Sequence, residues 1–493
     1  MVENGVRPRV AWPAVAVTGA LLAALLVATI DRYGYHRDEL YFRVLAGHPA
    51  WGYVDQPPLT PMLAKLSIAV FGDHLWSIRI PSILCALAIL LLVVLLTREF
   101  HGGSGAQLLA AAGACCSLVL VAGHLLSTAT VDLVVWLLVI LFAVRALLRG
   151  QPRWWLAAGV SAGLGTYNKQ LVVLLLIGVL AGLLIAGPRA ELRSPWLWAG
   201  AGIALVLAVP NLVYQVTHDW PQAKMAAAVS RNKGSSDRVM LLPFQLLLLG
   251  PPLVPIWIAG WIGLFRAPRW RPVRAFAWAY PVVLLLVLFT GGQPYYPLGL
   301  LLALYAAGCV NTAGWAADRT GRRALLAAGL ALNVVVSVVV ALPVLPVRSL
   351  PAAVVALNST QGDSIGWPAY VRQVADAYRS LPAAERAVAV IVTGNYGEAG
   401  AIDRYGPGYG LPAVYSGHNE LYRFGPPPDT ATVVLFVGYR RAEVAQWFAD
   451  CAELTRLDNG VGVDNEEQGN PVLVCRQPHR PWHELWPQLQ QYD

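Results

Sequence analysis

Residues 127–144 read STATVDLVVWLLVILFAV, an apolar stretch with a single acid near its start. A helix rises by about 1.5 Å per residue, so this stretch crosses most of a hydrocarbon layer roughly 30 Å thick. It therefore predicts a membrane-spanning helix. An acid such as Asp132 at the edge of a span is costly unless it is paired or faces a cavity.

Similar apolar blocks occur along most of the chain. They lie at residues 13–30, 81–97, 106–122, 155–167, 170–187, 196–214, 241–264, 275–290, 296–312 and 324–346. Several are at the short end for a span. The sequence therefore predicts a polytopic α-helical membrane protein with about eleven transmembrane helices, and a merged or missed helix stays open.

The composition supports this class. Of the 493 residues, 57% are hydrophobic and 13% are charged, about half the charged share of soluble domains. If the N-terminus is cytoplasmic, the two short outside loops near residues 123–126 and 291–295 hold no Lys or Arg, whereas the inside loops hold Arg7, Arg9, Arg98, Arg145, Arg149, Arg153, Arg189, Arg193, Arg266, Arg269, Arg271, Arg274, Arg319, Arg322 and Arg323. This positive-inside pattern accounts for the net charge of +8 and argues against a nucleic-acid partner.

On this topology we expect two domains. Residues 1–346 form a transmembrane domain with long external loops at 31–79 and 215–240, and residues 347–493 form an extracytoplasmic domain. The short apolar runs at 388–393, 432–437 and 471–475 predict strands, and residues 441–450 have helical spacing. A small α/β domain fits this pattern. Cys451 and Cys475 could pair in an oxidising compartment.

The first external loop holds the most informative segments, Tyr33–Tyr41 (YGYHRDELY) and Trp51–Leu59 (WGYVDQPPL). Asp38 and Glu39 follow a span closely, and Asp55 follows in a loop stiffened by two prolines. Carboxylates near a bilayer lose solvation, which raises their proton affinity and suits a general base beside a lipid-borne substrate. The alternative is that Asp38 or Glu39 caps a short helix.

Further polar residues occupy the predicted outer ends of spans. Lys169 lies between two spans, where it either snorkels or binds phosphate in a cavity lined by acids such as Asp132. Asp132 itself could instead satisfy a helix dipole. Tyr295 and Tyr296 are typical of the interfacial aromatic belt, and His124 is either an interfacial hydrogen-bonding residue or part of the site.

Motifs of soluble enzymes are missing. The sequence has no Walker loop, HExxH, paired CxxC or GxSxG motif, which argues against an ATP-driven transporter on this chain alone.

Residues 1–345 resemble the membrane glycosyltransferases of GT-C fold. The resemblance rests on four features in a fixed order: the Asp38-Glu39 pair, the segment Asp55-Gln-Pro-Pro-Leu59, Asp132 at the head of a span and Lys169 in an outer turn. Within this class the chain looks like the protein O-mannosyltransferase and aminoarabinose-transferase group. The external tail, with Gly394–Glu398 (GNYGE) and Ser416–Glu420 (SGHNE), is similar to the external domain of bacterial members.

The resemblance implies an inverting transfer of a sugar from a polyprenyl-phosphate donor, with Asp38 as the base, on the outer face of a bacterial plasma membrane. Gln56 stands where the aminoarabinose transferases carry a lysine near the donor phosphate. Lys169 would therefore take more of the phosphate charge, with help from Arg231 or Lys233. The candidate site residues are Asp38 and Glu39 for catalysis; Lys169, Asp132, Asp55, Gln56, Arg231, Tyr295 and Tyr296 for the donor; and His124, Asn395, Tyr396, Glu398, His418 and Asn419 for the acceptor.

Three points stay open at this level. The acceptor is a glycan, a lipid or a protein, and the sequence does not name the sugar. No cofactor is firmly implied, although Asp38, Glu39, Asp55 and His124 could gather a divalent metal. The alternative functions are a transporter or lipid flippase, whose ionisable groups usually lie nearer the midplane, and a non-catalytic assembly partner.

Overall fold

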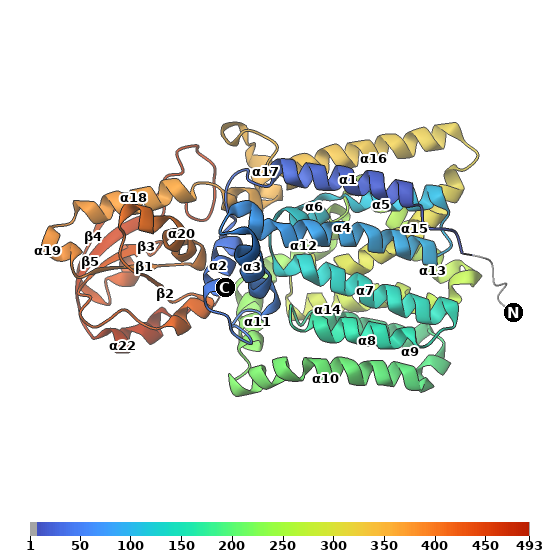
Figure 1. Ribbon diagram of the computed structural model, residues 1–493, viewed down its shortest axis with the longest axis horizontal. Coiled ribbons are helices and arrows are strands. Elements are labelled where there is room, and N and C mark those ends of the chain that lie inside the picture. The colour runs from blue at the N-terminus through green and yellow to red at the C-terminus, as the bar shows by residue number, and fades with distance from the viewer. Residues whose placement is uncertain (1–6, 493) are drawn as a thin grey trace. The chain divides into compact units, whose positions relative to one another are not determined.

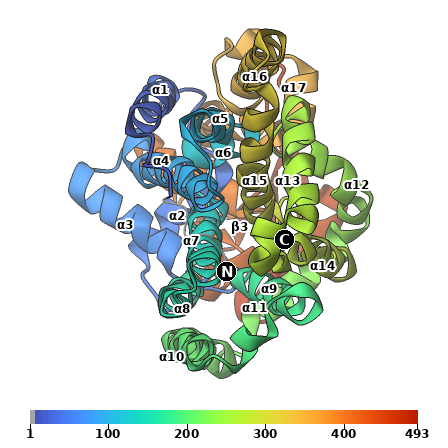
Figure 2. The same cartoon turned by 90° about the vertical axis from the view of Figure 1, so that its right-hand side faces the viewer.

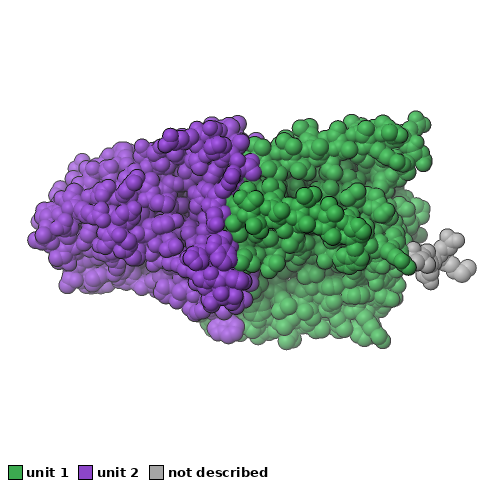
Figure 3. Space-filling model, turned by 45° about the horizontal axis from the view of Figure 1, so that its top comes forward, with its two compact units in different colours: residues 1–30, 56–60, 79–342 green, residues 31–55, 61–78, 343–493 purple. Residues whose placement is uncertain are grey.

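The computed structural model describes residues 7–492, so residues 1–6 and 493, the outermost ends of the two predicted domains, lie outside the described part. The chain divides into two compact units, coloured separately in Figure 3. Unit 1 comprises residues 1–30, 56–60 and 79–342, and unit 2 comprises residues 31–55, 61–78 and 343–493. The first external loop and the C-terminal region therefore fall mainly in the same unit.

Unit 1 is helical, and its long helices run side by side (Figure 1). Its helices are α1 (Trp12–Thr29), α4 (Leu75–Glu99), α5 (Ser104–Ala114), α6 (Ser117–His124), α7 (Thr128–Arg149), α8 (Trp154–Gly165), α9 (Val172–Ala186), α10 (Pro195–Thr217), α11 (Pro221–Asn232), α12 (Gly234–Leu247), α13 (Val254–Arg266), α14 (Ala275–Thr290), α15 (Leu298–Ala316) and α16 (Thr320–Ala341). The 3₁₀ helices η1 (Arg189–Arg193), η2 (Pro251–Leu253) and η3 (Pro268–Val273) lie in the connections.

Six of these helices, α1, α4, α7, α10, α15 and α16, are long and apolar enough to cross a membrane. The count rises to eight if the bent pairs α5 with α6 and α12 with α13 each form one span. All eleven predicted blocks contain helix, but α8, α9 and α14 have only 12, 15 and 16 residues. The chain is a multi-pass membrane protein, and the number eleven stays a prediction.

Burial separates the central helices from the peripheral ones. The apolar windows of α7 and α15 are 67% and 72% buried, whereas those of α1, α10 and α16 are each 17% buried. Figure 2 shows the same arrangement, with α7 and α15 in the middle and α1, α10 and α16 at the periphery. The outward faces of the peripheral helices carry exposed Leu, Val and Trp side chains, as expected of helices that face lipid.

Glycines allow close approach between helices in unit 1. A Cβ atom on Gly308 of α15 would lie 1.8 Å from the Ile256 carbonyl oxygen of α13, and one on Gly159 of α8 would lie 2.1 Å from the Gly200 carbonyl oxygen of α10. Small residues at such crossings let helix backbones pack tightly where no hydrophobic driving force exists between helices in lipid.

Several of the arginines that the sequence analysis placed in the inside loops converge on one buried acid. Glu99, at the end of α4, is fully buried. Its carboxylate lies 3.2 Å from Arg7 Nε, 3.1 Å from Arg145 Nε and 2.9 Å from Arg149 Nε. This network joins the N-terminal segment to α4 and α7.

Unit 2 contains a five-stranded sheet with the order β2-β1-β3-β5-β4. Its strands are β1 (Ala389–Thr393), β2 (Val414–Ser416), β3 (Val433–Val437), β4 (Phe448–Arg456) and β5 (Pro471–Pro478). β1 runs parallel to β2 and β3, and β5 runs antiparallel to β3 and β4. Val434, Phe436 and Leu473 on one face join a core with the aromatic C-terminal segment.

The helices of unit 2 come from both ends of the chain. They are α2 (Arg37–Gly47), α3 (Leu59–Phe71), α17 (Ala352–Leu357), α18 (Trp367–Ser380), α19 (Ala383–Arg386), α20 (Tyr396–Tyr405), α21 (Arg441–Val444) and α22 (Trp482–Leu485), with 3₁₀ helices η4 (Val347–Ser349), η5 (Ser359–Ser364), η6 (Gly406–Tyr409), η7 (Asn419–Phe424) and η8 (Trp486–Leu489). In Figure 1, α18 lies on one side of the sheet and α22 on the other.

The predicted strands at 388–393, 432–437 and 471–475 are confirmed as β1, β3 and β5. The helical prediction for residues 441–450 is wrong beyond its first turn, because α21 ends at Val444 and β4 begins at Phe448. Pairing with β5 overrides the local helical spacing there. Cys451 and Cys475 are cross-strand partners and form a disulfide.

The segment 215–240, predicted as a loop, is largely helical. It contains the end of α10, all of α11 and the start of α12.

Candidate active site

Asp38 lies in the first turn of α2, and the residues around it explain its exposure. His36 is the N-cap of α2, and its Nδ1 accepts a hydrogen bond from the Asp38 backbone N–H at 3.2 Å. The Glu39 carboxylate accepts from the His36 backbone N–H at 2.9 Å, which completes a capping box. Glu39 is fully buried, whereas the Asp38 side chain is 35% exposed. The structure therefore places Glu39 in the helix cap and leaves Asp38 accessible.

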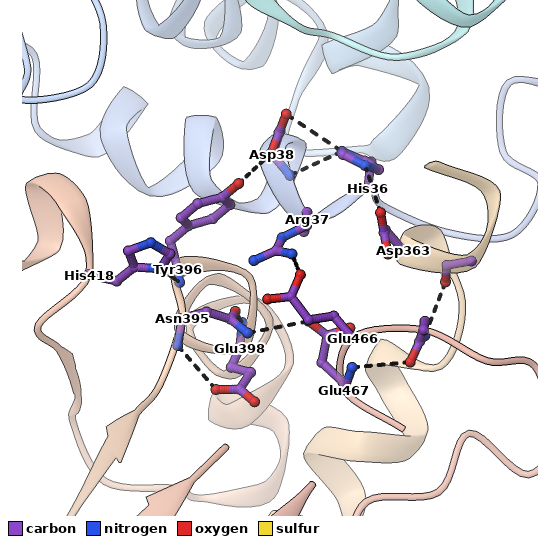
Figure 4. Close-up of polar contacts among 12 residues, drawn as sticks. His36, Arg37, Asp38, Asp363, Asn395, Tyr396, Glu398, His418, Glu466 and Glu467 are labelled. Atoms are coloured by element: carbon purple, nitrogen blue, oxygen red, sulfur yellow. Dashed lines mark hydrogen bonds and ion pairs between the residues drawn. The ribbon is translucent and has the colours of Figure 1, made fainter. Parts of the chain in front are cut away.

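The Asp38 carboxylate contacts the C-terminal part of unit 2. The Tyr396 hydroxyl donates to Asp38 Oδ1 at 2.8 Å (Figure 4). Tyr396 is the first residue of α20, where β1 ends and the chain turns into the helix. Gly397 and Gly400 permit α20 to pack on α2, since a Cβ on them would lie 2.9 Å from Arg37 Cβ and 2.8 Å from Leu40 Cβ.

Asp55 also accepts a tyrosine hydroxyl. Tyr41 of α2 donates to Asp55 Oδ1 at 3.0 Å, and its hydroxyl accepts from the Glu420 backbone N–H at 3.2 Å. Burial raises the pKa of Asp55 to about 7, with contributions from the negative charges of Glu420 and Asp38, against the hydrogen bond from Tyr41. The rings of Tyr41 and Tyr396 stack at 4.7 Å, so the two acids flank a stacked tyrosine pair.

Arg37 is a member of this cluster that the sequence did not single out. It forms an ion pair with Glu466, and its guanidinium lies 4.9 Å from the centre of the Tyr396 ring. Figure 4 shows it among Asp38, Tyr396 and the acids Glu466 and Glu467. Its position between His36 and Asp38 in the sequence was the available signal. Glu466 and Glu467 lie in the loop between β4 and β5 and carried no signal.

Several residues predicted to bind the acceptor instead hold the backbone and the ring of Tyr396 in place. Asn395 is the N-cap of α20, and its side chain accepts from the Glu398 backbone N–H at 2.9 Å. The Glu398 carboxylate accepts from the Gly394 backbone N–H at 3.0 Å. His418 Nδ1 accepts from the Tyr396 backbone N–H at 3.2 Å, and its ring stacks on Tyr396 at 4.9 Å.

Asn419, another predicted acceptor residue, is buried and adopts φ +50°, a left-handed conformation that asparagine tolerates. Glu398 and Glu467 are buried carboxylates near one another. Burial raises the pKa of each to about 7. Asn395, Glu398, His418 and Asn419 are therefore largely enclosed, and among the predicted acceptor residues of unit 2 Tyr396 contacts Asp38.

Unit 1 gathers a second cluster around Lys169. Its Nζ lies 4.8 Å from the centre of the Tyr296 ring and 5.8 Å from that of Tyr295. These two rings meet edge to face at 5.2 Å. Asp132 of α7 is buried and interacts electrostatically with Lys169. Cation–π contacts and a nearby carboxylate stabilise an ammonium group in a low-dielectric site.

Hydrogen bonds from neighbouring residues fix the turn that carries Lys169. Asn168 Nδ2 donates to the Thr128 carbonyl at 2.7 Å, which ties the turn to the start of α7. Thr60 Oγ1 donates to Asn168 Oδ1 at 2.8 Å. This second bond anchors residues 56–60, including the buried Gln56, beside the Lys169 turn. Asn168 and Thr60 carried no recognisable motif.

Two other predicted residues have different surroundings. His124 Nε2 lies 3.1 Å from Arg79 Nη1, and both side chains are buried. Arg231 is exposed at the end of α11. Among residues 7–492, no group of three or more His, Cys, Asp or Glu side chains could hold a metal ion.

Comparisons with known proteins show which folds this chain is similar to. Residues 55–214 match the family model described as dolichyl-phosphate-mannose-protein mannosyltransferase. No curated protein sequence matches the chain. The crystal structure of ArnT from Cupriavidus metallidurans in the apo state is similar with a TM-score of 0.60 and 14% identity, over 94% of this chain and 98% of that chain. ArnT bound to undecaprenyl phosphate gives a TM-score of 0.57 and 14% identity, over 93% and 97%. The predicted resemblance to GT-C membrane glycosyltransferases is therefore confirmed at the level of the fold.

Proposed function

We propose that this protein is a membrane glycosyltransferase that moves a sugar from a polyprenyl-phosphate donor to an acceptor hydroxyl on the extracytoplasmic face. The observation that carries the proposal is the partly exposed Asp38 carboxylate, held at the start of α2 in a chain whose fold is similar to that of ArnT along nearly its whole length. A structure of ArnT holds undecaprenyl phosphate. The family match over residues 55–214 supports the same class of donor.

Asp38 acts as the general base in this proposal. It removes the proton of the acceptor hydroxyl, and the acceptor oxygen forms a bond with the anomeric carbon of the donor sugar. The bond between that carbon and the phosphate oxygen breaks, and polyprenyl phosphate leaves with the electron pair. Attack opposite the leaving group inverts the anomeric configuration. A positioned base of this kind contributes roughly 10²- to 10⁴-fold to the rate.

Lys169 supplies positive charge for the donor phosphate. Its ammonium group, framed by Tyr295 and Tyr296, is a point charge suited to a phosphate oxygen. Charge that develops on the leaving phosphate is stabilised most strongly by groups that are already fixed in place. The negative charge of Asp132 compensates the positive charge of Lys169 when no donor is bound. Asp55 lies in the first external loop, as Asp38 does, and its pKa of about 7 suits it to accept or release a proton near neutral pH.

The proposal is tested with the full chain reconstituted in liposomes and a panel of radiolabelled polyprenyl-phosphate hexoses and pentoses. We expect wild type to consume at least one donor. Asp38→Asn should slow transfer about 10²- to 10⁴-fold, and Lys169→Met should raise the KM for the donor. Asp31→Asn, which changes an exposed acid earlier in the same loop, is the matched control. Equal rates for wild type and Asp38→Asn would overturn the assignment of the base, and movement of lipid or sugar across the bilayer without transfer would favour a flippase.

A further inference from the structure

The two oxygens of the Asp38 carboxylate have different environments. Oδ1 accepts the Tyr396 hydroxyl at 2.8 Å. Oδ2 lies 3.9 Å from His36 Nδ1, which is too long for a hydrogen bond. His36 Nδ1 already accepts the Asp38 backbone N–H, so it is not oriented to donate to the carboxylate. With 35% of the side chain exposed, Oδ2 is the oxygen suited to receive a proton from an acceptor.

The donor to Oδ1 is itself held in place. The Tyr396 ring stacks on Tyr41 at 4.7 Å and on His418 at 4.9 Å, and the Arg37 guanidinium lies 4.9 Å from its centre. Its backbone is fixed by the capping box of α20 and by the bond to His418 (Figure 4). A side chain whose rotamer is locked in this way fixes its partner at little further entropic cost.

We infer that Tyr396 is a positioning residue for the base, which orients Asp38 through Oδ1 and leaves Oδ2 to the acceptor hydroxyl. The inference rests on the proposed function and deepens it, because it assigns part of the base's machinery to a residue 358 positions away in the C-terminal region. Replacing the hydroxyl would leave Asp38 in place but free it to rotate.

The protonation of Tyr396 fits this role. Burial, followed by the negative charge of Asp38, holds the pKa of the Tyr396 phenol well above its usual range. We therefore expect Tyr396 to stay protonated and to donate to Asp38. A hydrogen bond to the ionised carboxylate favours that form, so its removal is expected to make Asp38 easier to protonate. The charged and titratable groups that interact with Asp38 are His36, Arg37, Asp55, Asp363 and Tyr396.

The central variant is Tyr396→Phe in the full chain. Hydrogen bonds to charged groups are among the stronger ones, so we expect kcat to fall about tenfold with the donor KM unchanged, and the acid limb of the pH profile to move up by about one unit. The matched control is Tyr439→Phe. Tyr439 is a buried tyrosine whose hydroxyl has no hydrogen-bond partner among the described residues. The Tyr439→Phe variant should therefore keep the wild-type kcat and pH profile.

A second readout does not depend on turnover. A water-soluble carbodiimide modifies protonated carboxyl groups, and mass spectrometry locates the modified residue. The pH midpoint for modification of Asp38 should rise by about one unit in Tyr396→Phe. A ring-fluorinated tyrosine at position 396 keeps the packing and donates more strongly, so it should move the midpoint in the opposite direction. This variant keeps the inference testable if Tyr396→Phe folds poorly.

The outcomes separate the two proposals. If Asp38→Asn is inactive but Tyr396→Phe keeps the wild-type rate, profile and midpoint, the inference is overturned and the proposed function stands. If wild type consumes no donor but the midpoint shifts as expected, the proposed function fails and the Tyr396–Asp38 contact stands. A loss of rate without any shift in the profile or midpoint would make Tyr396 a structural residue and would also overturn the inference.

Discussion

Glu99→Gln tests whether the buried charge network stabilises unit 1. Glu99 is fully buried, and its carboxylate lies within hydrogen-bond distance of Arg145 Nε and Arg149 Nε and forms an ion pair with Arg7. Glutamine has nearly the same size but no charge. The substitution therefore leaves the packing in place and removes the negative charge around which the arginines gather.

The magnitude follows from the cost of leaving buried charge uncompensated. Removing one partner of a buried ion pair costs about 3–5 kcal/mol. The glutamine oxygen still accepts one guanidinium N–H, so we expect a value near 3 kcal/mol, the low end of that range. A destabilisation of that size lowers the unfolding temperature of a large domain by about 6–12 °C.

Thermal unfolding is measured with a fluorophore that reacts with thiols exposed on unfolding. Cys85, Cys115, Cys116 and Cys309 are free, lie in the helices or helix junctions of unit 1, and are buried or half-buried. The disulfide-bonded pair of unit 2 does not react. The fluorescence therefore reports on unit 1, and wild type and variant are compared at the same heating rate because membrane proteins often unfold irreversibly.

Asp219→Asn is the control for the loss of a negative charge at the surface. Asp219 is 84% exposed and pairs with Lys224, and exposed pairs contribute little to stability. We expect Asp219→Asn to unfold at the wild-type temperature. If Glu99→Gln also unfolds at that temperature, the network does not stabilise unit 1 and the reasoning is refuted.

Two further predictions concern unit 2, whose stability is measured by hydrogen exchange of its strand amides. Gly400→Ala should destabilise unit 2 by about 1–3 kcal/mol because the new methyl group meets Leu40 at 2.8–2.9 Å. Gly408→Ala places a methyl group that meets nothing within 4 Å, so it should leave the protection of the same amides unchanged, and a gain in protection from Gly400→Ala would contradict the packing. The pKa values of Glu398 and Glu467 are raised to about 7, so the folded state binds more protons than the unfolded state from about pH 4.5 to 7, and stability should fall as pH rises through that window. Hydrogen exchange of the strand amides should therefore quicken between pH 5 and pH 8 by more than the exchange of unprotected amides does. Glu467→Gln should make this loss of protection smaller. Equal protection factors at pH 5 and pH 8 in wild type would contradict the prediction.

Several elements were predictable because their signals are local. An apolar block occurs at every predicted span, although several are short, and the cost of exposing backbone polar groups in lipid makes each such block helical. The runs that became β1, β3 and β5 are short, apolar and β-branched, which favours buried strands. The Asp38-Glu39 pair stood out because carboxylates beside a span lose solvation, and the resemblance to the GT-C glycosyltransferases pointed to Asp38 as the base.

Other elements depended on partners far away in the chain. Residues 441–450 have helical spacing, but the second half pairs with β5 and forms β4, because the hydrogen bonds and disulfide of that pairing outweigh local propensity. For Glu39 the sequence left both a catalytic and a helix-capping role open, and Glu398 was a candidate for binding the acceptor. The folded backbone shows that each closes a capping box.

The sequence by itself determined that this is a multi-pass membrane protein, that it carries a C-terminal sheet region and that Asp38 is a candidate base. The first two conclusions follow from the composition and spacing of neighbouring residues, and the third also needed the resemblance to the GT-C glycosyltransferases. The tertiary structure alone decided that Tyr396 holds Asp38, that Asn168 fixes the Lys169 turn and that Glu99 gathers the arginines. These contacts join residues tens to hundreds of positions apart. Close packing, which no local pattern encodes, brings them together.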